Sequence, residues 1–244
     1  MVDSDSDSIL SHLIELRDRL LRCVVSFLIV FVCLFPWARD IYTVLAEPLL
    51  SALPVGGQMI ATEVVSPFFV PIKVTMLAAL VLVLPYLLYQ FWAFVAPGLY
   101  TKEKNLVFPL IVTSTLLFIV GMAFAFYVVF PVVFHFITSI APDGVAVMTD
   151  IQKYLDFVIT LFIAFGLTFE VPIAVVILTR AGILTVQKLK DGRPYVIVGA
   201  FVIGAIFTPP DVISQILLAI PLWFLYEAGI LVSLWLGSKK EESA

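Results

Sequence analysis

Long apolar runs alternate with short polar segments along this chain. A transmembrane helix needs about 20 mostly apolar residues, within a range of about 17–25. The pattern therefore predicts an all-α polytopic membrane protein with a single membrane domain over residues 1–244. Its six transmembrane helices are expected roughly over residues 22–38, 73–96, 106–130, 154–180, 195–207 and 212–236.

The last two of these helices are separated only by the motif Thr208-Pro209-Pro210-Asp211. Because proline fixes φ and lacks a backbone N–H, the double proline is expected to end one helix and allow a tight turn into the next. The two helices should form a hairpin. The first, with about 13 residues, would span about 20 Å of a hydrocarbon core about 30 Å thick. Either the bilayer thins around it, or polar groups and water reach its end.

An amphipathic segment, residues 8–21, precedes the first apolar run. At about 100° per residue, one face is polar and the opposite face is apolar, which is typical of a helix in the membrane interface. Arg17 falls on the apolar side, where it either snorkels to lipid head groups or acts as a buried anchor. The polar face carries Ser11, Glu15, Asp18, Arg19 and Arg22.

Composition and charge support a membrane protein and set its orientation. The chain is 62% hydrophobic and 13% charged, with a mean hydropathy of +1.12, and its net charge of −4 gives no basic field for nucleic acid. With the N-terminus inside, eleven of the fourteen Lys and Arg residues lie in inner segments, and only Arg39, Lys73 and Lys153 lie outside. Both termini are therefore expected in the cytoplasm.

The first outer loop, residues 39–72, is too apolar for a free linker. It contains Val64-Val65 and Phe68-Phe69 together with four prolines. We expect it to fold back as an extracytoplasmic cap on the outer membrane face.

The sequence offers no nucleophile, metal cluster or phosphate loop, so neither an enzyme nor a cofactor is expected. His12 and His135 should lie on opposite sides of the membrane, which argues against a shared metal site. Function is expected to come from binding sites.

Glu170 is the acidic residue that the pattern places near the middle of the fourth span. A charged side chain there costs about 2.5–3.5 kcal/mol on insertion scales, so a carboxylate at this depth is a functional candidate by default. The alternative is a neutral, protonated acid that is hydrogen-bonded inside the bundle. Glu227 is expected at a similar depth in the last span, either paired with Glu170 across a groove or hydrogen-bonded structurally.

Several spaced motifs along almost the whole chain resemble the TatC family, the large subunit of the twin-arginine protein translocase. Together they are far more specific than any one alone. They are the run from His12 to Leu20, Ser66-Pro67-Phe68-Phe69, Phe94 to Tyr100 with Glu103, Phe169-Glu170-Val171-Pro172, Arg193-Pro194-Tyr195, and Thr208-Pro209-Pro210-Asp211.

The resemblance implies a cup-shaped, six-helix receptor in the cell inner membrane that binds signal peptides with consecutive arginines and initiates the export of folded proteins. It assigns the peptide contact to Glu15 and Glu103, and adds Arg17 and Phe94 to this site. A guanidinium forms bidentate, charge-assisted hydrogen bonds with a carboxylate that lysine cannot reproduce. The implied partners are signal peptides of folded cargo, membrane lipids and the small single-span subunits TatA and TatB, in an oligomeric complex driven by the proton gradient.

By the same resemblance, a groove for partner helices involves Glu170, Thr208 and Gln215, and the expected depth of Glu227 adds it to this groove. Self-satisfied helix caps remain an alternative for Thr208 and Gln215. Interhelical polar contacts in lipid contribute about 0.6–2 kcal/mol each. Structural roles in the cap and turns fall to Pro48, Phe68 and Asp211. The sequence departs from the family pattern at Asp18, Asn105 and Ala205.

Two other classes of function remain open. A proton-coupled secondary transporter could use Glu170 as its carrier site, although such proteins usually show repeated halves and this chain shows no repeat. A structural membrane scaffold without a ligand would need neither Glu15 nor Glu103.

Overall fold

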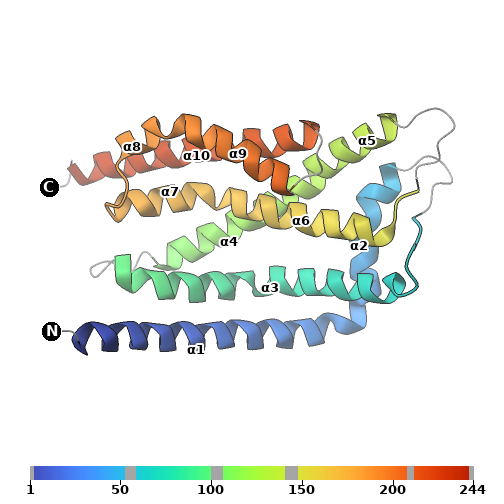
Figure 1. Ribbon diagram of the computed structural model, residues 1–244, viewed down its shortest axis with the longest axis horizontal. Coiled ribbons are helices and arrows are strands. Elements are labelled where there is room, and N and C mark those ends of the chain that lie inside the picture. Colours follow the sequence, from blue (N-terminus) through green and yellow to red (C-terminus); the bar gives the residue numbers. More distant parts are fainter. Residues whose placement is uncertain (1–2, 53–58, 100–106, 141–147, 208–211, 242–244) are drawn as a thin grey trace. The chain divides into compact units, whose positions relative to one another are not determined.

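The computed structural model describes residues 3–52, 59–99, 107–140, 148–207 and 212–241 (Figure 1). Regular structure in these ranges is helical, apart from one isolated bridge between Ile60 and Asp150. The elements are α1 (Asp3–Leu34), η1 (Phe35–Trp37), α2 (Ala38–Ala52), α3 (Ser66–Leu99), α4 (Val107–Phe124), η3 (Ala125–Val129), α5 (Phe130–Ile140), α6 (Ile151–Phe169), α7 (Val171–Arg180), α8 (Val186–Asp191), α9 (Arg193–Phe207) and α10 (Val212–Glu241).

Five helical segments of the described chain are long and apolar enough to cross a membrane. They run over His12–Glu47, Ser66–Phe94, Phe108–Phe136, Ile151–Arg180 and Val212–Trp235. The sixth apolar helix, α9, has 15 residues and is therefore only about 22 Å long. The fold is that of an all-α membrane protein, and α9 is its short apolar helix.

The amphipathic N-terminal segment and the first apolar run form one continuous helix, α1. No helix breaker lies between residues 8 and 34, and Pro36 follows in η1, where proline fits the first turn of a new helix. The polar face that carries Glu15 is thus held rigidly on the same helix as the apolar run.

The chain divides into two compact units. The first unit comprises residues 1–42 and 71–115, and the second comprises residues 43–70 and 116–244. In the first unit, α1 and α3 run side by side in opposite directions (Figure 1). Trp92 on α3 donates from Nε1 to the hydroxyl of Ser114 at 3.3 Å. This bond links the first part of α4, which belongs to the same unit, to α3.

The second unit is built around aromatic side chains of α4, η3, α5 and α6. Phe130 and Phe165 are fully buried, and the Phe130 ring stacks on that of Phe162 with centroids 5.2 Å apart. Aromatic pairs of this kind contribute about 0.5–1.5 kcal/mol beyond the area that they bury. Gly121 on α4 lies directly against the backbone of Phe165, so the two helices meet without a side chain between them.

The long helical run from α4 to α5 is interrupted by the π-helical turn η3. A π turn inserts one extra residue into an α-helix and occurs mostly as a single-turn bulge. Ala125 and Val129, at its two ends, are both fully buried. The two ends of the turn therefore face the packed core, whereas Tyr127 between them is 75% exposed.

The segment before α3 is tied to the start of α6. Ile60 N–H donates to Thr149 O at 3.0 Å, and Ile151 N–H donates to Ile60 O at 2.9 Å. Thr62 donates from its N–H and its hydroxyl to Asp150 Oδ2, at 2.9 and 2.6 Å. The other oxygen of Asp150 caps α6 by accepting from Gln152 N–H and Lys153 N–H. These bonds, from Thr62 foremost, lower the pKa of Asp150 to about 2.

Replacing Asp150 with alanine is expected to open this corner, because one carboxylate joins the helix cap to the segment before α3. Amide hydrogen exchange at Gln152 and Lys153 should become several-fold faster. Thr62→Val is the matched variant: it removes one donor, leaves the cap bonds, and should accelerate exchange less. Because the pKa of Asp150 is depressed, its stabilisation is complete above pH 3.8 and is lost as the pH falls toward 2. Equal exchange in the two variants would contradict this assignment.

Candidate functional site

Glu15 is the acidic residue on α1 around which the polar contacts of the first unit gather. Arg19, one turn later, donates from Nε and Nη2 to Glu15 Oε1 at 2.9 and 2.6 Å. The second oxygen of Glu15, Oε2, lies 4.0 Å from Nδ1 of His12. The Glu15 side chain is 40% exposed, so it is both paired and accessible.

Arg19 also reaches the neighbouring helix. Its Nη1 donates to Gln90 Oε1 on α3 at 3.0 Å, and Gln90 Nε2 donates to the hydroxyl of Tyr86 at 2.8 Å. Gln90 is only 4% exposed. Because a guanidinium can only donate, the carbonyl end of Gln90 must face Arg19, and the bond to Tyr86 fixes that orientation. A buried side chain of α3 thus positions Arg19, and through it Glu15.

His12 and Phe94 form a second contact between α1 and α3. Their rings are stacked with centroids 4.3 Å apart and an interplanar angle of 18°. His12, Glu15 and Arg19 follow the three- and four-residue spacing of a single helix face. Glu15 therefore lies between two links to α3, an aromatic stack on one side and a hydrogen-bonded guanidinium on the other.

Among the other residues expected at this site, Arg17 also lies on α1. Its side chain is 67% exposed and donates from Nε and Nη2 to Asp18 Oδ1. Of the two alternatives for Arg17, this exposure fits a group free to reach lipid head groups and not a buried anchor. The link that an anchor would have made is made by Arg19.

Of the residues expected to bind a peptide, Glu15 and Phe94 lie close together, because His12 contacts both of them. Glu103 lies outside the described residues, as do Thr208 and Asp211 of the expected hairpin turn. Neither His12 nor Gln90 was expected at the site, and Arg19 was expected only as part of a polar face. The spacing of Glu15 and Arg19 signals a helical ion pair, whereas no local pattern points to Gln90.

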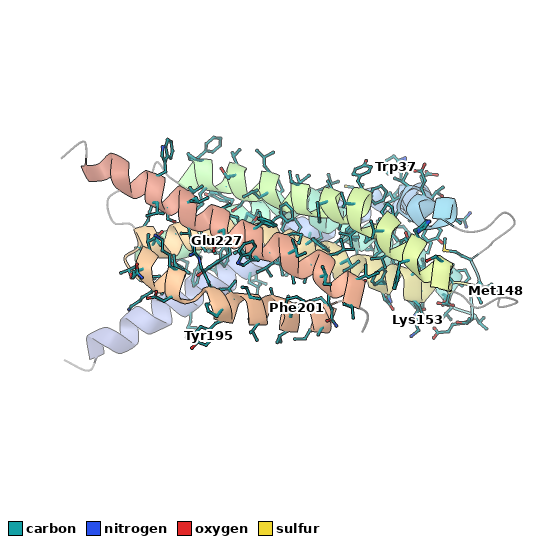
Figure 2. All side chains as sticks on the ribbon, turned by 90° about the horizontal axis from the view of Figure 1, so that it is seen from above. Trp37, Met148, Lys153, Tyr195, Phe201 and Glu227 are labelled. Carbon is teal, nitrogen blue, oxygen red and sulfur yellow. The ribbon has the colours of Figure 1, made fainter. Side chains whose placement is uncertain are left out.

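Glu170 and Glu227 were expected either to pair with each other or to be hydrogen-bonded structurally. Glu170 lies at the junction of α6 and α7, and its Oε1 is buried. Both oxygens of Glu227 accept from Arg193, each at 2.6 Å, in a bidentate pair between α10 and the start of α9. Figure 2 marks Glu227 on α10. Of the two alternatives for Glu227, this geometry fits the structural hydrogen bond.

Gln215 lies in the second turn of α10, against Gly204 of α9. A Cβ on Gly204 would be 3.4 Å from the Gln215 backbone, so the hairpin closes tightly at this end. Nearer the start of α9, the two helices border an apolar groove of about 290 Å³, and Figure 2 marks Phe201 in its lining. The groove is lined by Ile197, Ala200, Phe201, Ala219, Ile220 and Trp223.

The residues expected to shape the cap lie on two helices. Pro48 belongs to α2, and Phe68 lies in the first turn of α3. The Phe68 ring is 65% exposed and makes an edge contact with the ring of Phe69. An exposed aromatic pair at a helix start is suited to contact with lipid.

The chain matches a family model over residues 11–221, and the family is described as the Sec-independent protein translocase protein TatC. It is 53% identical to the TatC protein of Haemophilus influenzae, over 98% of this chain and 94% of that protein. It is 54% identical to the TatC protein of Escherichia coli K12, over 94% of this chain and 89% of that one.

Solved structures agree with these sequence relatives. A crystal structure of the twin-arginine translocase receptor TatC superposes with a TM-score of 0.81 at 38% identity, covering 92% of this chain and 98% of that one. A second crystal structure, of the same receptor in DDM, gives a TM-score of 0.83. The family is a component of a protein translocase and not an enzyme. The match over most of the length, in sequence and in fold, shows that this chain belongs to the TatC family of Sec-independent protein translocase proteins.

Proposed function

We propose that this chain is the receptor for twin-arginine signal peptides and the core scaffold of a translocase that exports folded proteins. The observation that carries the proposal is the carboxylate of Glu15, which is accessible and already accepts a guanidinium in the first unit. A carboxylate is the group that accepts a guanidinium in bidentate, charge-assisted hydrogen bonds, so it is suited to an arginine of a ligand. Glu103 is proposed as the second carboxylate, so that two acidic groups select a pair of arginines.

The membrane topology of the proposal follows the distribution of Lys and Arg. Both termini and the Glu15 segment lie on the cytoplasmic face of the inner membrane, where a signal peptide arrives before export. The proton gradient supplies the energy, since the sequence contains no nucleotide-binding loop. Arg17 and Phe94 contribute to the peptide site from α1 and α3.

Partner helices of the small subunits TatA and TatB are proposed to bind the second unit, in an oligomeric complex. The apolar groove between α9 and α10 offers a surface for an apolar helix, and Gln215 and Thr208 supply polar groups near the hairpin turn. Glu170, whose Oε1 is buried, and the paired Glu227 complete this region. Family membership favours a protein translocase over the secondary transporter that Glu170 alone would allow.

Replacing Glu15 with glutamine tests the proposal. The change keeps the shape of the side chain but removes the charge that a guanidinium needs. Binding of a twin-arginine peptide to the purified receptor in lipid nanodiscs should weaken about 10- to 100-fold, which corresponds to about 1.4–2.8 kcal/mol. Isothermal titration calorimetry measures this loss, and a peptide with both arginines replaced by lysine should bind the unchanged receptor weakly.

Glu47→Gln is the matched control for this experiment. It removes an exposed carboxylate from α2, on the proposed outer side, and should leave peptide binding unchanged. In cells that lack their own TatC, the Glu15 variant should fail to export a folded reporter, whereas the Glu47 variant should export it. Normal export by the Glu15 variant would instead favour a scaffold that does not read the arginines.

A further inference from the structure

One oxygen of the Glu15 carboxylate is already occupied in this structure. Two N–H groups of Arg19 donate to Glu15 Oε1, and the shorter of the two hydrogen bonds is 2.6 Å. The Arg19 side chain is 21% exposed, whereas the Glu15 side chain is 40% exposed. The group proposed to receive an arginine of the ligand therefore already holds an arginine of its own helix. An incoming guanidinium meets both the occupied oxygen and the positive charge that occupies it.

The position of Arg19 is set by more than its helix. An ion pair between residues four apart on an exposed helix contributes only about 0.3–0.5 kcal/mol, which a ligand would displace easily. Here the third arm of the guanidinium is bound by Gln90, which is buried on α3 and oriented by Tyr86. The guanidinium is thus held in place on Glu15 from two helices, and it is a stronger competitor than a solvated pair would be.

We propose that Arg19 is an internal ligand of Glu15 that the signal-peptide arginine must displace, so that the Arg19–Gln90 contact sets the affinity threshold of the receptor. This inference rests on the proposed function of Glu15. When a site is open for only a fraction of the time, the apparent affinity of every ligand falls by that fraction. Arg19 therefore weakens binding without itself contributing a contact to the peptide.

The same displacement changes the link between α1 and α3. With the ligand on Glu15, Arg19 loses the acceptor on its own helix and retains only Gln90. One of the two contacts that flank Glu15 is altered by binding, while the stack of His12 on Phe94 is not directly involved. Peptide binding is in this way coupled to the contact between α1 and α3.

Arg19→Met tests the proposal, because methionine keeps an unbranched stem and removes the guanidinium. Binding of a twin-arginine peptide to the full chain in nanodiscs should become about 5- to 10-fold tighter. Arg22→Met is the matched control: it removes the same charge from the next turn of the same helix, at an exposed position. Its effect should be less than about 2-fold at 0.15 M salt, where exposed charges are screened beyond about 8 Å.

The decisive measurement is a double-mutant cycle with Glu15→Gln. If Arg19 acts by occupying Glu15, then Arg19→Met should tighten binding only when Glu15 is present, and should have no effect in the Glu15→Gln background. A residue that merely supports the fold would weaken binding when replaced, and a residue that acts through charge alone would tighten binding in both backgrounds. Either of these results overturns the proposal.

The peptide-binding role of Glu15 and the internal-ligand role of Arg19 are contradicted by different results. If Glu15→Gln leaves peptide binding intact, the proposed function of Glu15 fails, and this inference fails with it. If Glu15→Gln weakens binding but Arg19→Met does not tighten it, the internal ligand alone is overturned. Should Arg19→Met not fold, Arg19→Lys carries the test. A lysine keeps the charge without the fork and should tighten binding about 2- to 3-fold, whereas unchanged or weaker binding overturns the proposal.

Discussion

Replacing Gly121 with alanine is expected to lower the free energy of unfolding by about 3 kcal/mol, the upper end of the usual range for overpacking. A Cβ at this position would lie 2.6 Å from the carbonyl oxygen of Phe165 and 3.0 Å from its carbon. Backbone atoms cannot rotate out of the way as a side chain can, so α4 and α6 would have to move apart. Moving them apart would loosen the aromatic core that the two helices share.

Two other glycines provide the controls for Gly121. A Cβ on Gly166 would lie 2.4 Å from the ring of Phe118, which is itself buried, so Gly166→Ala should also destabilise the fold. A Cβ on Gly199 in α9 would meet nothing within 4 Å. Gly199→Ala should therefore be neutral or stabilising by up to about 1 kcal/mol, because alanine favours a helix. Thermal unfolding in detergent should place the Gly121 and Gly166 variants below the Gly199 variant, and equal stability of the Gly121 and Gly199 variants would contradict the close approach of α4 and α6.

Breaking the pair between Arg193 and Glu227 is the second change with a large expected effect. Glu227→Met leaves a guanidinium at the start of α9 without the carboxylate that accepts two of its N–H groups. Arg193 is 43% exposed and can turn toward water, so breaking this pair costs less stability than breaking a fully buried pair. We expect a melting temperature about 5 °C lower.

The double variant Arg193→Met/Glu227→Met distinguishes a specific pair from general loss of charge. Replacing both members of a partly buried pair with apolar side chains is often neutral, whereas replacing one member strands the other. The double variant should therefore be more stable than either single one. A double variant as unstable as the sum of the two would mean that the two groups stabilise the chain independently.

The apolar runs were sufficient to predict the helices and the membrane class, because length and hydropathy decide whether a segment can span a bilayer. The short length of α9 was also evident, since Pro209 and Pro210 limit how far the helix can extend. The continuity of α1 was not evident. A change from amphipathic to apolar composition marks a change of surroundings, and it does not by itself end a helix.

Contacts between segments far apart in the chain could not be predicted from the sequence. Arg19 and Gln90 are 71 positions apart, and which side of α3 faces α1 depends on how the helices are rotated. The same limit applies to Glu227, whose depth in the membrane could be estimated but whose partner could not. Arg193 was expected only as an inner charge and as part of the motif Arg193-Pro194-Tyr195, yet it is the partner of Glu227.

The π turn η3 has a consequence for the helix that contains it. Each residue of an α-helix advances the side-chain direction by about 100°, so the one additional residue in Ala125–Val129 changes the phase between α4 and α5 by about that angle. A stripe of apolar positions that faces one way before the turn continues on a different side after it. Gly121 before the turn and Phe130 after it both meet α6, at Phe165 and at Phe162, so one helical run contacts the same neighbour on both sides of the change in phase.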